Sequence, residues 1–102
     1  MNEAESSPRI GQFVYITEGR EAGQYAVVVS ILDERFVFIA DGEKRPFHSP
    51  KKKNVNHLEF IDRVSPEVQN SIKETGRVTN GKLRHALKTF VNEQAADLKK
   101  GE

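Results

Sequence analysis

The residues of this sequence best suited to chemistry are basic side chains that stand beside glycines and amides. Residues 19–23 place Arg20 between two glycines, and Pro50 is followed by three lysines and an asparagine. Glycine lets a backbone approach a phosphate closely, and an arginine can form forked hydrogen bonds to that phosphate. Consecutive lysines supply point charges to neighbouring phosphates. These patterns predict a surface that binds a polyanion.

Each of these residue types also has a simpler structural explanation. Arg20 could pair with Glu18 or Glu21, and the lysine run could be an exposed, solubilising turn. The Tyr25 ring follows the glycine loop and could either stack on a base or pack inside the protein. Asparagine and histidine side chains can donate hydrogen bonds to phosphates, base edges or a 2′-hydroxyl. The predicted binding residues are Gly19, Arg20, Gly23, Tyr25, Lys44, Arg45, Lys51, Lys52, Lys53, Asn54 and His57.

A second cationic stretch runs from Arg77 to Lys88 and contains no acidic residue. On a helix it would form either a second phosphate-binding surface or a solvated face. The apolar residues of the same stretch, such as Leu83 and Leu87, would form core or dock on a partner protein. The candidate residues of this second basic surface are Arg77, Lys82, Arg84, His85 and Lys88.

The composition argues against catalysis and against metal or cofactor chemistry. The 102 residues include no cysteine, which excludes disulfides, thiol catalysis and cysteine-ligated zinc. His48, His57 and His85 do not have the spacing of zinc ligands. The glycine loop lacks the lysine and hydroxyl of a nucleotide-hydrolysing phosphate loop. We expect no enzyme activity, no cofactor and no metal. Without a signal peptide or an apolar membrane span, we expect a cytoplasmic location and no membrane partner.

The first sixty residues have the pattern of short strands rich in β-branched and aromatic side chains. Asp33-Glu34-Arg35 and Asp41-Gly42 provide turns between them. We expect the side chain of either Phe36 or Phe38 to point inward and form part of the core. Five short strands in so short a segment predict a small barrel, with the last strand returning beside the first. The expected strands are 12–17, 24–32, 35–40, a short one near 44–48, and 54–61.

The pattern becomes helical at Ser65-Pro66, a typical cap followed by a first-turn proline. Apolar residues then recur at helical spacing, and Gly76 ends the first helix. Thr79 or Asn80 would cap a second helix, whose apolar positions continue to Leu98. The two halves could pack together or form separate modules. The predicted organisation is a flexible tail at 1–8, a barrel at 9–62, a helical pair at 65–98 and a tail at 99–102.

The glycine loop and its flanking strands resemble the KOW motif, a β-loop-β unit of ribosomal proteins and transcription elongation factors. An ordered set of residues is similar to the L-fourteen-e type of large-subunit ribosomal protein and to bacterial KOW-domain proteins. The resemblance covers residues 9–62 and implies an α+β chain, a small SH3-like (KOW) five-stranded β-barrel followed by two C-terminal α-helices. The matching residues are Gly11, Gly19-Arg20-Glu21-Ala22-Gly23, Val28, Asp33, Phe36-Val37, Asp41-Gly42, Lys44-Arg45, Pro50-Lys51-Lys52-Lys53-Asn54 and His57-Leu58.

This resemblance implies non-catalytic binding of RNA, ribosomal or otherwise structured, in translation or ribosome assembly. The alternative is an adaptor that docks on ribosomal or transcription proteins through the barrel and the helices. A third reading, DNA binding by the helical pair as a helix-turn-helix, needs a connector shorter than the one expected at 75–80.

Overall fold

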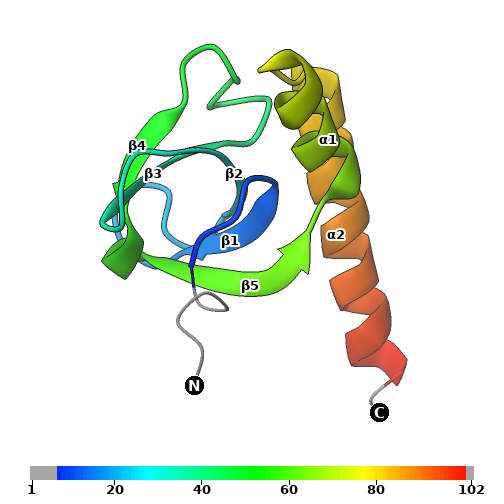
Figure 1. The fold of residues 1–102 in the computed structure, drawn as a ribbon. Coiled ribbons are helices and arrows are strands. Elements are labelled where there is room, and N and C mark those ends of the chain that lie inside the picture. Colours follow the sequence, from blue (N-terminus) through cyan, green and yellow to red (C-terminus); the bar gives the residue numbers. More distant parts are fainter. Residues whose placement is uncertain (1–6, 101–102) are drawn as a thin grey trace.

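The computed structural model describes residues 7–100, and in residues 97–100 only the backbone. Five antiparallel strands form one sheet in the order β4-β3-β2-β1-β5, which rolls into an open barrel (Figure 1). Two helices follow. The elements are β1 (Gln12–Ile16), β2 (Tyr25–Ile31), β3 (Phe36–Ala40), β4 (Lys51–Asn54), the 3-10 helix η2 (Val55–His57), β5 (Leu58–Val64), α1 (Pro66–Thr75) and α2 (Asn80–Lys100).

This architecture confirms the expected α+β class, and β5 pairs with β1 as predicted. The fourth strand, however, was wrongly expected near 44–48. Asp41 instead accepts hydrogen bonds from the backbone N–H groups of Glu43 and Arg45 and holds this segment in a turn. The strand forms at Lys51–Asn54, where the chain pairs with β3. The fifth strand begins later than expected because Asn54 caps η2 with its side chain.

Alternation along the strands gives the sheet two apolar faces. The inner face packs Val14, Val28, Val37 and Ile39 against Leu58 inside the barrel. Neither Phe36 nor Phe38 points inward, contrary to the expectation for one of them. Val37 and Ile39 take the inward positions, so both phenylalanines lie half-buried on the outer face.

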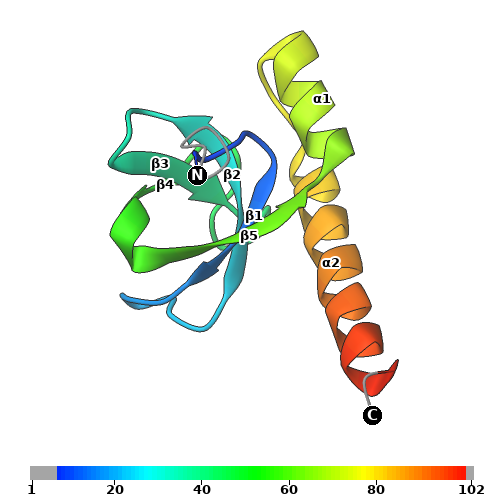
Figure 2. The same ribbon diagram turned by 60° about the horizontal axis from the view of Figure 1, so that its bottom comes forward.

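The helices cover part of that outer face, and the two halves of the chain share one core. Phe90 of α2 stacks on Phe13 of β1 with ring centroids 4.4 Å apart. Val68 of α1 and Leu83 of α2 are fully buried in the same cluster. Figures 1 and 2 show both helices on one side of the barrel, with the C-terminal part of α2 extending beyond it. The barrel therefore supplies the apolar partner that the helices need.

Two glycines allow the helices to approach the barrel this closely. A Cβ at Gly42 would overlap the carbonyl oxygen of Asn80 and stand 3.0 Å from the Cβ of Leu83. A Cβ at Gly11 would stand 3.0 Å from Gln69 of α1. Both glycines have positive φ, so each serves the turn and the helix contact together.

The helix boundaries follow the predicted signals. The Ser65 hydroxyl accepts a hydrogen bond from the backbone N–H of Val68, and Gly76 ends α1 in the left-handed region. Thr79 accepts from the N–H of Lys82, which makes it the cap of α2. The connector, residues 76–79, is shorter than expected.

The apolar face of α2 is shorter than its sequence pattern suggested. Val91 is 42% exposed and Ala95 is exposed, while the Leu98 side chain lies outside the described part. Helix α2 runs to Lys100, past the predicted end at 98. The tails expected at 1–8 and 99–102 fall mostly outside the described residues.

Candidate nucleic-acid interface

The glycine loop between β1 and β2 is joined to the opposite edge of the barrel by a lysine. Lys53 lies opposite Val37 on β3, so its side chain starts from the inner face of the sheet. Its ammonium donates a 2.8 Å hydrogen bond to the carbonyl oxygen of Glu18. The residue is 8% exposed, which leaves little of it for a ligand. Lys53 therefore closes the barrel between β4 and the loop.

An ion pair and a histidine contact connect other predicted binding residues to the same loop. The Arg45 guanidinium lies 2.9 Å from the Glu21 carboxylate, and His57 Nε2 lies 3.5 Å from that of Glu18. Of the predicted binding residues outside the loop, Lys53, Arg45 and His57 thus lie against the glycine loop. Of the two loop carboxylates, that of Glu21 is neutralised by the Arg45 guanidinium.

Arg20 and Lys44 remain available on this end of the barrel. Arg20 lies at the exposed tip of the β1–β2 loop, and Lys44 is exposed in the turn that Arg45 links to that loop. Neither side chain makes a hydrogen bond or ion pair with the described residues. Arg20 does not pair with Glu18 or Glu21, which was the simpler explanation for this residue. Those two carboxylates lie beside His57 and Arg45 instead.

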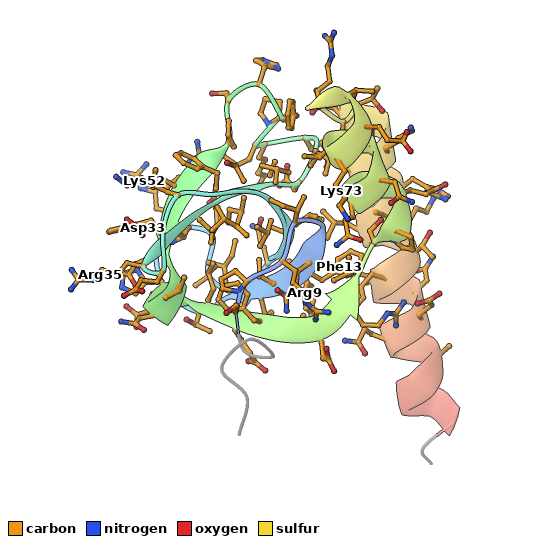
Figure 3. All side chains as sticks on the ribbon, viewed as in Figure 1. Arg9, Phe13, Asp33, Arg35, Lys52 and Lys73 are labelled. Atoms are coloured by element: carbon orange, nitrogen blue, oxygen red, sulfur yellow. The ribbon has the colours of Figure 1, made fainter. Side chains whose placement is uncertain are left out.

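The lysine run is a strand, so its three side chains alternate. Lys52 points outward, with its ammonium 4.8 Å from the centroid of the Phe36 ring, while Lys51 is half-buried. Figure 3 shows Lys52 beside Arg35 and Asp33, on the side of the barrel away from the helices. Lys52 therefore lies on the outer face of β4, opposite to the face from which Lys53 reaches the glycine loop. Asn54 uses its side-chain oxygen to accept from the N–H of Asn56.

The second basic surface is divided by the way α2 packs. Arg84 and Lys88 line a groove beside Tyr25, and the Arg84 guanidinium donates a 2.8 Å hydrogen bond to the carbonyl oxygen of Gly42. His85 lines another hollow, where Arg63 pairs with Glu93. Arg77 lines a third hollow with His48, and Lys82 is exposed. Only Arg84 and Lys88 join the Tyr25 side of the barrel.

Several residues of this region were not among the predicted binding residues. Gln24, Glu43, Leu87 and Val91 line the groove beside Tyr25. Their convergence depends on how α2 docks on the barrel, which local patterns do not encode. Lys53 was predicted to bind a ligand because the sequence does not show its hydrogen bond to the distant carbonyl oxygen of Glu18.

The described side chains form no cluster suited to a metal ion. Within residues 7–96, no three histidine, aspartate or glutamate side chains group so that they could hold one. None of the helices in residues 7–100 is long and apolar enough to cross a membrane.

Comparisons with known proteins place the chain in a family. Residues 10–39 match the family model of the KOW motif. The chain is 61% identical over 71 residues to a Bacillus subtilis protein named "Putative ribosome-binding protein YbzG", a match that spans 70% of this chain and 96% of that protein.

Archaeal ribosomal proteins are also similar. The large ribosomal subunit protein eL14 of Pyrobaculum calidifontis is 39% identical over 89 residues, spanning 79% of this chain and 86% of that protein. The eL14 protein of Staphylothermus marinus is 38% identical over 55 residues, spanning 54% of this chain and 57% of its own length.

Proposed function

Since the chain belongs to the KOW-motif family that includes YbzG and the archaeal eL14 proteins, we propose that it binds ribosomal RNA as a non-catalytic protein of translation. The names of these relatives describe ribosome binding and membership of the large subunit. The proposal has two parts. The first is that the chain associates with ribosomes in the cytoplasm, and the second is that it contacts RNA directly.

One observation carries the RNA assignment. Arg20 and Lys44 are exposed on neighbouring loops and make no hydrogen bond or ion pair within residues 7–100. Lys88 is likewise exposed and unpaired among these residues, on the helix beside the same end of the barrel. Unpaired cations on one surface attract a polyanion because each phosphate contact releases bound counterions. These three residues and the neighbouring Arg84, whose guanidinium also donates to the carbonyl oxygen of Gly42, are named the loop-end cations.

The mechanism is positioning without chemistry. Arg20 would form forked hydrogen bonds to a phosphate, while Lys44 and Lys88 would act as point charges. The contacts of Lys53, Arg45 and the two loop acids would hold the backbone of the loops, so that only the cationic side chains need to be ordered on binding. Such preorganisation lowers the entropic cost of association.

The adaptor alternative has less support in its helical part. The apolar side of the helices is used within the chain, where Val68, Leu83 and Phe90 are buried against the barrel. A docking helix would need such a face free. The large apolar side chains that stay exposed are Ile31 and Leu32 on the β2–β3 hairpin, 39% and 54% exposed, and Val91 on α2, 42% exposed. An adaptor would therefore have a single large exposed apolar side chain of the described helical residues to use.

Sedimentation distinguishes RNA contact from protein contact. The full chain is mixed with salt-washed ribosomes and, separately, with deproteinised ribosomal RNA, and each mixture is spun through sucrose. RNA binding predicts cosedimentation with both. Cosedimentation with ribosomes and not with deproteinised RNA would contradict the proposal and favour the adaptor.

A further inference from the structure

A groove of about 550 Å³ lies between the barrel and α2, next to the β1–β2 loop. It joins Tyr25, from the predicted binding set, to Arg84 and Lys88, from the predicted second basic surface. Two sets of residues that are distant in the sequence thus form one concave site. The groove is lined by Gln24, Tyr25, Asp41, Glu43, Arg84, Leu87, Lys88 and Val91.

The floor of the groove is apolar and includes a well-supported aromatic ring. The Tyr25 ring lies edge-on to Phe90, with centroids 5.4 Å apart, and 5.1 Å from the ring of Tyr15. Phe90 in turn stacks on Phe13 in the core. Leu87 and Val91 complete the floor, and Val91 leaves 42% of its surface in solvent. A ring fixed by other rings is a rigid platform for a flat ligand.

The walls carry opposite charges. Lys88 has no hydrogen-bond or ion-pair partner within residues 7–100, and Arg84 is fixed by its bond to Gly42. On the other wall, the Asp41 carboxylate accepts two hydrogen bonds, from the backbone N–H groups of Glu43 and Arg45 in its own turn. The Glu43 carboxylate makes no such contact with the described residues. The groove therefore offers cations on one side and a free acceptor on the other.

We propose that this groove binds one unpaired nucleotide of an RNA, an inference that rests on the proposed function. The base lies against Tyr25, Leu87 and Val91, and its phosphate lies at Lys88 with Arg84. The Glu43 carboxylate accepts a hydrogen bond from an N–H group on the base edge. A nucleotide matches all three features, since it combines a flat ring, an anion and edge donors. A base within a duplex has its edge paired and its faces stacked on its neighbours, so the ligand of this site is an unpaired base in a loop, bulge or end.

The test compares two RNA hairpins that differ in one nucleotide. One carries a single bulged 2-aminopurine in its stem, and the other has the same stem fully paired. We expect the bulged hairpin to bind roughly tenfold more tightly, which lies within the range for stacking a base on an aromatic ring. We also expect the 2-aminopurine fluorescence to be quenched on binding.

Two variants test whether the preference for the bulged hairpin arises in the groove. Lys88→Gln and Val91→Asp change exposed residues of the groove, so both proteins should fold. Each should lose most of the preference for the bulged hairpin and keep measurable binding to the paired one. Lys82→Gln, an exposed change on the same helix outside the groove, is the matched control and should keep the preference.

The outcomes separate this inference from the proposed function. Equal affinity for both hairpins, or a preference that survives in both groove variants, overturns the nucleotide site while leaving RNA binding intact. Binding to neither hairpin, together with no cosedimentation with ribosomal RNA, contradicts the proposed function itself.

Discussion

The ammonium of Lys53 fills the space beside Gly19 that any larger residue would need. A Cβ at Gly19 would stand 2.7 Å from Lys53 Nζ, which donates its hydrogen bond to the adjacent carbonyl of Glu18. Gly19 also has a φ of +101°, a conformation that favours glycine. The first glycine of the KOW loop therefore serves barrel closure, in addition to any approach of a phosphate.

Replacing this glycine should disturb the lysine as well as the backbone. Gly19→Ala should lower the free energy of unfolding more than Gly23→Ala does. Both positions have positive φ, which costs a non-glycine residue about 1–2 kcal/mol. At Gly23 the nearest atom to a Cβ is the Tyr15 hydroxyl, 3.9 Å away, so no further cost arises there. Urea unfolding of the two variants measures the difference.

A double-mutant cycle tests whether Lys53 causes the larger stability loss expected for Gly19→Ala than for Gly23→Ala. In a Lys53→Met background, Gly19→Ala and Gly23→Ala should cost about the same, because the displaced ammonium is gone. An excess cost at Gly19 that persists in this background would show that the lysine is not its cause.

Neighbouring lysines of β4 should differ in their contribution to stability. Lys53→Gln should lower the free energy of unfolding by about 1 kcal/mol, because it removes a hydrogen bond from a charged donor. Lys52→Gln changes an exposed side chain that contacts one ring face and should cost less than about 0.5 kcal/mol. Chemical unfolding at matched pH and salt compares them. Equal costs would count against a structural role specific to Lys53.

Sequence patterns predicted much of the fold because the signals are local. Ser65-Pro66 and Gly76 bound α1 as expected, and β1 to β3 follow their β-branched runs. The fourth strand was missed because Lys51–Asn54 lacks such residues, and its state depends on pairing with β3. Phe36 and Phe38 were misjudged because the register, set by distant strands, turns Val37 and Ile39 inward.

The glycine at the start of the β3–β4 turn should be critical for helix docking. Gly42→Ala should destabilise the chain by several kcal/mol, since a Cβ there overlaps the backbone of Asn80 and adds to the φ strain. Gly76→Ala is the control, because it has a similar φ with no atom within 4 Å of its Cβ. Similar losses of thermal stability in the two variants would contradict close docking of α2 at Gly42.

Removing the helices should remove the cooperative fold. A chain ending at Val64 would expose Phe13, Val27 and Val29, which pack against Val68, Leu83 and Phe90. Losing several fully buried partners costs roughly 2–5 kcal/mol each, comparable with the whole stability of a small domain. We expect no sharp urea transition for this fragment. A cooperative transition equal to that of the full chain would show that the barrel folds as a separate module.

Sequence patterns could group candidate residues only where these are contiguous. Arg20 and the glycines are candidates because they stand together in the loop motif, and their role in binding stays a prediction. The roles of Lys53 and Arg45 depend on partners in the loop, and the groove at Tyr25 exists only because α2 packs beside it. Charge patterning alone grouped Arg84 with His85, although helix packing directs them to different hollows.

The salt dependence of RNA affinity tests the central claim most directly. Anisotropy of labelled ribosomal RNA fragments is measured from about 50 to about 300 mM salt, with double-stranded DNA of equal length for comparison. For the unaltered chain we expect a slope of log affinity against log salt of roughly −3 to −5, with weaker binding to DNA. Arg20→Gln with Lys44→Gln should make that slope shallower by about 1 to 2, because two phosphate contacts are lost. Lys73→Gln, an exposed change on α1, should leave the slope within about 0.5 of its original value. A slope near zero, or one that Arg20→Gln with Lys44→Gln does not change, would contradict RNA binding by the loop-end cations.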